Sequence, residues 1–382
     1  MTPAAFSFMT ATEILFGRGK AALAAARVAA LGNRVFLLQG KSAARADWLA
    51  AALVAAGATV LRQTVATEPD LPMVEAATLA ARGFGATVVV SLGGGAVIDA
   101  GKAVAALLPA TRPALDHLEV VGRGLPLDHP PVPFVAMPTT AGTGAEVTRN
   151  TVIGVPKHRR KVSLRDARML PRLAIIDPAL TDHCPRGITL ASGLDAITQV
   201  IEPYISARAN PLTDALCIPA IPLGLAALQR LMAGERAQAR DDMAFVSLCG
   251  GLALANAGLG VVHGLAGPLG GLVNAPHGAI CGVLLPHALM LNRNRVADPQ
   301  RAARIDQVLG WIGAAYGVAP DQGPATLADW SRRCGLPGLA AMGITTADAM
   351  AAAQAAATSS SMQANPVALN QADLLALLQA AS

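Results

Sequence analysis

The first half of the chain alternates short apolar runs with Ala-rich segments of helical length, and this alternation constrains the fold more than any other sequence feature. Residues 34–38, 59–61 and 87–91 are rich in β-branched and apolar side chains, and residues 43–56 and 74–82 have helical composition. Apolar strands separated by helices pair in parallel, with helices covering both faces of the sheet. We therefore predict a doubly wound, mainly parallel α/β domain.

The second half lacks this alternation. After Asp177 the strand pattern fades, and the rest of the chain is composed as Ala- and Leu-rich helix interrupted by Gly and Pro. A chain of 382 residues also exceeds the roughly 250–300 residues that one core organises. We expect two domains, an α/β domain over residues 1–183 and an all-helical domain over residues 184–382.

The composition raises the question of a membrane protein, because 53% of the residues are hydrophobic and only 14% are charged. The most apolar stretches, residues 215–228 and 251–273, contain Pro219, Pro222, His263 and Pro268. Neither is an uninterrupted apolar run of about 20 residues, and the N-terminus lacks the basic and apolar regions of a signal peptide. We expect a cytoplasmic protein without a membrane partner.

Charge and cysteine content exclude further classes. The net charge of +5 comes with only 3% aromatic residues, so the basic, aromatic-rich surface of a nucleic-acid binder is not expected. The five cysteines form no Cys-x-x-Cys pair and are odd in number. This pattern argues against a disulfide framework and against a thiolate zinc site.

Two turns carry the pattern of an anion-binding site. Gly93, Gly94 and Gly95 follow an apolar run and precede a helix, while residues 138–144 combine threonines with glycines after another run. Glycines permit close backbone approach, and a helix N-terminus favours a diphosphate. Taken alone, each loop is equally compatible with a tight turn, but two at the carboxyl ends of successive strands favour a nucleotide.

A set of possible metal ligands lies in the helical half. Asp195 and Gln199 are four residues apart and share one helix face, and His263 and His277 flank an apolar stretch. One carboxylate and two imidazoles form a common divalent-metal set. Buried histidines without a ligand role remain the alternative.

These residues are ordered as in the iron-containing, or group III, alcohol dehydrogenases, which the chain resembles almost end to end. The matching segments are 14–17, 93–102, 138–148, 177–178, 193–204, 263–270, 276–278, 285–287 and 365–366. The resemblance implies a dehydroquinate-synthase-like architecture and a homodimer. It also implies a dinucleotide on Gly94, Gly95, Asp99, Thr139, Thr140, Thr148 and Lys161, and a metal, Fe²⁺ or Zn²⁺, on Asp195, Gln199, His263 and His277.

Three positions depart from the family pattern, in which His usually stands at Gln199 and Gly267, and often Asp at Gly40. A neutral amide is a weaker ligand than imidazole, so Gln199 should lower metal affinity. Gly267 either enlarges the substrate pocket or removes a proton relay. Gly40, Lys41 and Ser42 are compatible with a 2′-phosphate, so NADP is slightly favoured over NAD.

The expected function is NAD(P)-dependent interconversion of a small alcohol and an aldehyde or ketone, with Asp195, His263 and His277 holding a catalytic divalent ion. Two alternatives stay open. The first is a metal-independent reductase of an oxo-acid, similar to maleylacetate reductases. The second is a non-catalytic dinucleotide-binding protein on the same scaffold.

Overall fold

The computed structural model describes residues 5–273, 275–357, 359 and 361–382. Its contacts divide the chain into two compact units. One comprises Thr10–Thr140 and Ala145–Asp182, and the other comprises the described parts of residues 5–9, Ala141–Gly144 and His183–Ser382. The sequence analysis places a single border between residues 183 and 184. The structure adds a short excursion, Ala141–Gly144, that packs with the helical unit.

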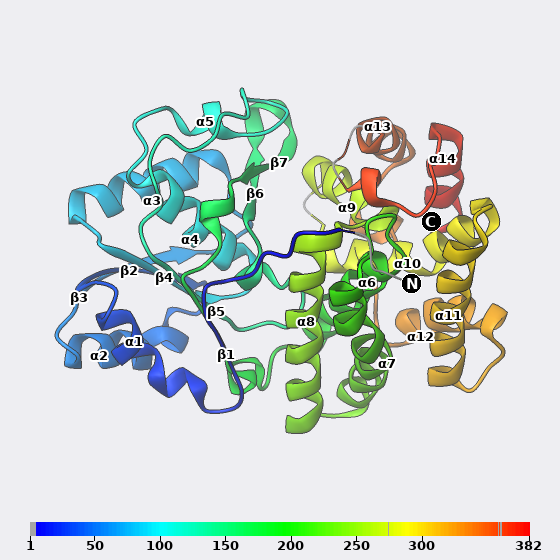
Figure 1. The fold of residues 1–382 in the computed structure, drawn as a ribbon, viewed down its shortest axis with the longest axis horizontal. Helices are drawn as coiled ribbons and strands as arrows, with labels where there is room; N and C mark the ends of the chain where they lie inside the picture. The colour runs from blue at the N-terminus through cyan, green and yellow to red at the C-terminus, as the bar shows by residue number, and fades with distance from the viewer. Residues whose placement is uncertain (1–4, 274, 358, 360) are drawn as a thin grey trace. The chain divides into compact units, whose positions relative to one another are not determined.

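The first unit is built on a parallel sheet with the strand order β1-β8-β5-β4-β2-β3 (Figure 1). Each neighbouring pair in this order is parallel. This confirms the predicted doubly wound α/β fold. The strands are β1 (Ile14–Phe16), β2 (Arg34–Gly40), β3 (Thr59–Val65), β4 (Val88–Gly93), β5 (Phe134–Pro138) and β8 (Leu173–Ile176).

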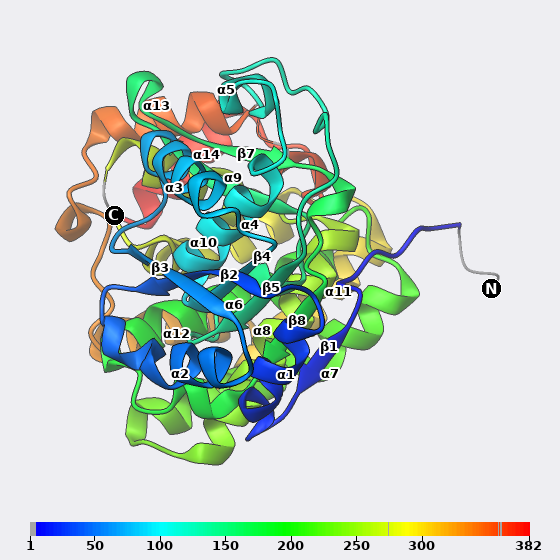
Figure 2. The same cartoon turned by 90° about the vertical axis from the view of Figure 1, so that its left-hand side faces the viewer.

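Helices cover both faces of this sheet because successive strand residues point to opposite sides. Val35 and Leu37 pack with α1 (Ala24–Ala29) and α2 (Asp47–Ala55). Phe36 and Leu38 pack on the other face with α3 and α4. Figure 2 shows the two helix layers on either side of the sheet. The second layer consists of α3 (Leu71–Phe84) and α4 (Gly95–Leu107).

An antiparallel hairpin, β6 (Asn150–Val155) and β7 (Arg160–Arg165), was not predicted from the sequence. Its strands are short. The basic residues 157–161, which span the turn and the start of β7, interrupt the apolar alternation that would indicate strands. Ile153, Val155, Val162 and Leu164 are buried together with residues of α3 and α4. The hairpin therefore extends the core beyond the sheet. The short helix α5 (Ala114–His117) precedes it.

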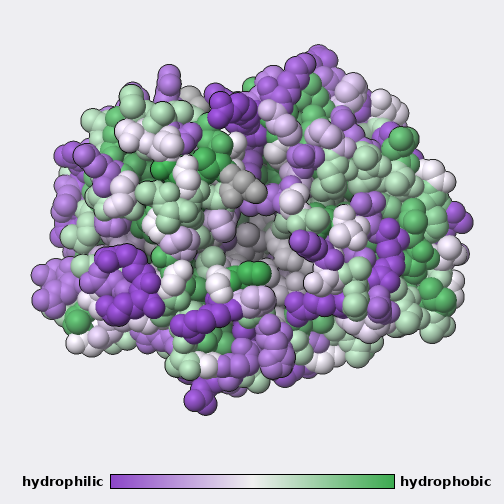
Figure 3. Space-filling model, turned by 180° about the vertical axis from the view of Figure 1, so that it is seen from behind, coloured by the Kyte–Doolittle hydropathy of each residue, from purple (hydrophilic) through white to green (hydrophobic). Residues whose placement is uncertain are grey.

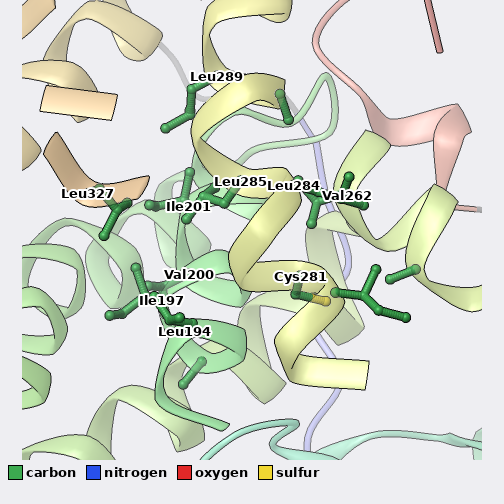
Figure 4. Packing of buried hydrophobic residues seen from close by; sticks show 14 of the residues in the cluster. Leu194, Ile197, Val200, Ile201, Val262, Cys281, Leu284, Leu285, Leu289 and Leu327 are labelled. Carbon is green, nitrogen blue, oxygen red and sulfur yellow. The ribbon is translucent and has the colours of Figure 1, made fainter. Parts of the chain in front are cut away.

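The second unit is mostly helical, and its described residues contain no strand, which confirms the predicted all-α domain. Its core is formed mainly by α6 to α10, and Figure 4 shows Leu194 and Val200 of α6 packed near Leu284 and Leu285 of α10. The helices are α6 (Arg186–Ile205), α7 (Pro211–Ala233), α8 (Ala237–Ala257), α9 (Val261–Leu272), α10 (His277–Arg295), α11 (Pro299–Tyr316), α12 (Gly323–Arg333), α13 (Thr346–Ala356) and α14 (Gln371–Ala380).

One prediction about apolar segments is wrong: helix α7 is, by length and composition, apolar enough to cross a membrane, as is the strongly bent pair α8 and α9 taken together. Pro219 and Pro222 lie inside α7 without ending it. The helix buries Cys217, Ile221 and Leu225 in the core of the unit, as a core helix does. The surface drawn in Figure 3 mixes hydrophilic and hydrophobic residues.

The buried carboxyl of Glu146 makes the stability of the first unit depend on pH. Burial raises the pKa of Glu146 from 4.5 to about 7, although Lys102 opposes the shift. The folded chain therefore keeps a proton that the unfolded chain loses, and this contribution to stability is present below about pH 4.5 and lost as the pH rises through 7.

We expect Glu146→Gln to be more stable than the parent at pH 8 but not at pH 4.5. The free energy difference should grow by roughly 3 kcal/mol between these values. Calorimetric melting at both pH values measures it. Glu75→Gln, on the exposed side of α3, is the matched control. An equal effect of Glu146→Gln at both pH values would show that its carboxyl does not titrate differently on folding.

Candidate functional site

The carboxyl ends of β2 and β4 form the topological switch point of the sheet. The two strands are neighbours, with Gln39 opposite Leu92. From β2 the chain passes through α2 to β3 on one side, and it then returns to β4 on the other side of β2. The loops after β2 and β4 diverge to opposite faces of the sheet, and ligands of open α/β sheets bind in such a crevice.

The glycine turn after β4 leaves the N-terminus of α4 open. Gly94 precedes the helix and no side chain caps it. A Cβ on Gly94 would lie 3.3 Å from Thr140 Oγ1, so the glycine lets the two loops approach closely. Thr139 N donates to Gly93 O at 2.9 Å. The structure therefore brings Gly94, Gly95, Thr139 and Thr140 together around free helix N–H groups, which suit a diphosphate.

Gly40 ends β2, and Lys41 and Ser42, both exposed, follow it at the same edge of the sheet. The loop is held by Arg62, which the sequence analysis missed. The Arg62 guanidinium donates to Gln39 Oε1 at 2.8 Å, Asp47 Oδ1 at 2.7 Å and Ala43 O at 2.6 Å. Pairing between β2 and β3 places Arg62 beside this loop, and a sequence without the strand register does not show it.

Three further residues implied by the family resemblance make contacts within the protein. Asp99 Oδ2 accepts from Val152 N at 3.1 Å, and Thr148 Oγ1 accepts from Lys102 Nζ at 2.8 Å. Lys161 forms an ion pair with Glu68. Their contact with a cofactor stays a prediction.

The proposed metal ligands of the helical unit converge on one point. Asp195 of α6, His263 of α9, and His277 and Cys281 of α10 each offer one ligand atom, and these atoms lie within 4.8 Å of one another. Asp195 Oδ1 is 3.3 Å from His263 Nε2 and 4.0 Å from His277 Nε2. Cys281 Sγ is 3.6 Å from His277 Nε2.

Two of these atoms are buried without a hydrogen-bond partner among the described residues: Asp195 Oδ1 and His263 Nε2. Asp195 is 2% exposed and His263 is 8% exposed. Leaving such atoms unpaired costs about 1–3 kcal/mol each, and a shared cation removes that cost. The donor set therefore fits a divalent metal.

Glu202 fixes the orientation of His263. Its carboxylate accepts from Val262 N at 2.7 Å, at the start of α9, and lies 2.7 Å from His263 Nδ1. A hydrogen bond at Nδ1 directs Nε2 toward Asp195 and makes the imidazole a better ligand. Sequence reasoning saw Glu202 only as part of a family motif.

The electrostatics of the cluster favour a positive charge. Burial lowers the pKa of His277, but the neighbouring Cys281 and Asp195 outweigh it and raise the pKa to about 9. Burial likewise opposes the rise in the pKa of His263, yet Cys281, Asp195 and Glu202 hold it well above its ordinary value. The raised pKa values mean that protons bind to these histidines, and a metal ion would displace those protons when it binds.

Gln199 and Cys281 differ from the sequence-based interpretation. Gln199 Nε2 donates to Thr143 O at 2.5 Å, so its amide anchors the Ala141–Gly144 segment. Cys281, which the sequence analysis did not count among the possible ligands, lies among the candidate ligand atoms. Its position four residues after His277, on the same helix face, was the available signal. No atom of the described residues lies within 4 Å of a Cβ placed on Gly267.

Comparison with known proteins decides the family. The iron-containing alcohol dehydrogenase model matches residues 11–178, and the model of the C-terminal region of Fe-containing alcohol dehydrogenases matches residues 189–382. The chain belongs to the iron-containing alcohol dehydrogenase family. Both halves match, which confirms the family relationship predicted from the order of the motifs.

Individual relatives agree with this assignment. The chain is 34% identical to lactaldehyde reductase of Escherichia coli K12 over 83% of its length and 82% of that protein. It is 33% identical to the NAD-dependent methanol dehydrogenase of Bacillus methanolicus, over 76% of each. A crystal structure of 1,3-propanediol oxidoreductase superposes with a TM-score of 0.87 at 30% identity, covering 99% of this chain and 100% of that one.

Proposed function

We propose that the chain interconverts a small alcohol and its aldehyde or ketone, using NADP(H) or NAD(H) and a divalent metal. The observation that carries the proposal is the convergence of Asp195 Oδ1 and His263 Nε2, both buried and unpaired among the described residues, with His277 Nε2. Relatives that act on methanol, lactaldehyde and 1,3-propanediol support a short, polar substrate.

The α/β unit supplies the cofactor site. Gly94, Gly95 and the open N-terminus of α4 hold the diphosphate, and Thr139 and Thr140 supply hydroxyl groups for further hydrogen bonds. The loop Gly40–Ser42, fixed by Arg62, faces the adenosine ribose. The nicotinamide supplies or accepts the hydride.

The helical unit supplies the metal ligands. Asp195, His263 and His277 are the catalytic residues because they hold the ion, which when bound acts as a Lewis acid on the substrate oxygen. Glu202 keeps His263 in the orientation that presents Nε2. Asp195 and His263 are buried, which keeps bulk water from these ligands and strengthens the electrostatics there.

The test is turnover of the purified chain. Formaldehyde, lactaldehyde and 3-hydroxypropionaldehyde are each assayed with NADPH and NADH, before chelation, after chelation and after readdition of Zn²⁺ or Fe²⁺. We expect turnover that chelation removes and metal restores. Turnover that is indifferent to chelation would support a metal-independent oxo-acid reductase instead. Cofactor binding without turnover would support a non-catalytic protein.

The loop after β2 predicts that NADPH is used at least as well as NADH. A Cβ on Gly40 has no atom of the described residues within 4 Å, so Gly40→Asp introduces its Cβ without a clash with them. The new charge repels a 2′-phosphate and accepts from a ribose hydroxyl. We expect the ratio of kcat/KM for NADPH over NADH to fall about 10- to 100-fold.

The measurement is this ratio in the parent and the variant at one ionic strength, with Gly40→Ala as the control for added volume. A parent that strongly prefers NADH, or a ratio that stays constant in Gly40→Asp, would show that this loop does not read the 2′ position. Lys41→Gln should move the ratio in the same direction, because it removes the exposed cation of the loop.

A cytoplasmic location and a homodimer complete the proposal. Both rest on family membership. Light scattering of the purified chain at micromolar concentration measures the assembly, for which we expect twice the 38.7 kDa of one chain.

A further inference from the structure

We propose that the thiolate of Cys281, and not the amide of Gln199, completes the metal site with Asp195, His263 and His277, and that this ligand set selects zinc over ferrous iron. The inference deepens the proposed function, on which it rests for the role of the ion in turnover. Metal binding itself is measured independently of turnover.

The distances fit a tetrahedral ion. Metal bonds of about 2.0–2.3 Å to nitrogen, oxygen and sulfur place neighbouring tetrahedral ligand atoms roughly 3.3–3.6 Å apart. Asp195 Oδ1 to His263 Nε2 is 3.3 Å, and Cys281 Sγ to His277 Nε2 is 3.6 Å. A third distance, Asp195 Oδ1 to His277 Nε2, is 4.0 Å and closes with a small side-chain movement, and the other pairs of ligand atoms lie within 4.8 Å.

Helix geometry holds the thiol in place. His277 and Cys281 lie four residues apart in the first turns of α10, so both side chains leave the same face. Cys281 is fully buried, and Figure 4 shows it on α10 among core side chains of the helical unit. A Cβ on Gly278 would lie 3.1 Å from Asp195 Cβ, so the glycine allows α10 to approach α6 at the cluster.

Gln199 has a different task. Its amide nitrogen donates to the carbonyl of Thr143, and its side chain packs against Gly250 of α8, where a Cβ would come within 3.4 Å of Nε2. Gln199 is 2% exposed, so this hydrogen bond is not exchanged for water. The residue therefore positions the Ala141–Gly144 segment.

Charge balance favours the thiolate. Asp195 with two neutral imidazoles compensates only one of the two positive charges of a divalent ion, and an amide ligand adds none. The thiolate of Cys281 brings the directly bound ligands to neutrality, while the Glu202 carboxylate lies outside them, on Nδ1 of His263.

The same thiolate sets the metal preference. Thiolate is a soft ligand that suits zinc, whereas an all-nitrogen and oxygen set discriminates less. Other buried cysteines lack this setting: burial raises the pKa of Cys249 to about 12, which keeps that thiol protonated and makes it a matched control.

The experiment uses Co²⁺ as a spectroscopic probe in the full-length chain, stripped with a chelator and reloaded without oxygen. Sulfur-to-cobalt charge transfer in the near ultraviolet reports a bound thiolate. We expect this band in the parent, in Cys249→Ala and in Gln199→Leu, and its loss in Cys281→Ser and Cys281→Ala. Bound Co²⁺ without the band in the parent, or a band that survives in Cys281→Ala, overturns the proposal.

Competition with a chromophoric chelator gives the second readout. Cys281→Ser should weaken Zn²⁺ binding at least 100-fold and Fe²⁺ binding no more than 10-fold, while melting temperatures verify that each variant is folded. Equal losses for both ions overturn the selectivity. A charge-transfer band without turnover refutes the proposed function alone, and metal-dependent turnover without the band refutes this inference alone.

Discussion

Replacing His263 by Ala is expected to lower kcat/KM for aldehyde reduction about 1,000-fold and to remove most of the bound metal. His263 supplies Nε2, a buried atom with no hydrogen-bond partner among the described residues, and Glu202 fixes that atom toward Asp195. Loss of the ligand removes Lewis-acid stabilisation worth several kcal/mol, and 1,000-fold corresponds to about 4 kcal/mol.

The measurement pairs steady-state kinetics with elemental analysis of the same preparation. His129, an exposed histidine between α5 and β5, provides the matched control His129→Ala, which should keep full activity and metal. The melting temperature of His263→Ala verifies that the variant is folded, because the substitution also removes a hydrogen-bond partner of Glu202. A full complement of metal together with unchanged kinetics in His263→Ala would exclude this residue as a ligand.

Glu202→Gln should also weaken metal binding, but by less than His263→Ala. An amide at this position still reaches Val262 N and His263 Nδ1, but it loses the negative charge that strengthens the imidazole as a ligand. We expect metal affinity to fall about 10- to 100-fold, as for other groups that orient a metal-bound histidine. Chelator competition measures the affinity. An unchanged affinity would show that Glu202 only stabilises the start of α9.

The fold of the first unit could be predicted because each strand and helix of the sheet has its own pattern of apolar residues. Runs such as Phe36 to Leu38 are apolar on both faces, which only a strand covered on both sides requires. The hairpin β6 and β7 escaped prediction because its strands are short and the basic residues 157–161 interrupt the pattern between them. Arg62 escaped for another reason, since its partners depend on the register between β2 and β3.

Only part of the metal cluster could be predicted from the sequence. Asp195, His263 and His277 stand out by residue type, but Cys281 does not, because a cysteine inside an apolar helix has the pattern of a core residue. Gln199 shares a helix face with Asp195, which suggested a ligand. Its hydrogen bond to Thr143 joins segments 56 residues apart, and no local pattern encodes such a contact.

Lys102→Met should produce the largest loss of stability in the first unit. Lys102 is 1% exposed, and its ammonium donates to Ala145 O at 2.7 Å, Thr148 Oγ1 at 2.8 Å and Asn150 O at 2.7 Å. Burial lowers the pKa of Lys102 to about 8, while Asp99 and Glu146 oppose that shift, so the side chain remains mainly charged at pH 7. One ammonium thus satisfies three acceptors of the segment that follows the Thr139–Thr140 loop.

Methionine has nearly the same length but donates no hydrogen bond, so the variant leaves these acceptors unpaired and Asp99 without its nearby cation. Breaking a buried charged network in this way costs about 3–5 kcal/mol, which lowers the melting temperature by roughly 10 °C in a unit of this size. Because residues 145–150 follow the threonine loop, KM for the cofactor should rise at least 10-fold in the fraction that remains folded. Calorimetry and cofactor titration measure the two effects, with the exposed Lys20→Met as control, expected within about 0.5 kcal/mol of the parent. A melting temperature for Lys102→Met equal to that of the control would show that water replaces the ammonium at all three acceptors.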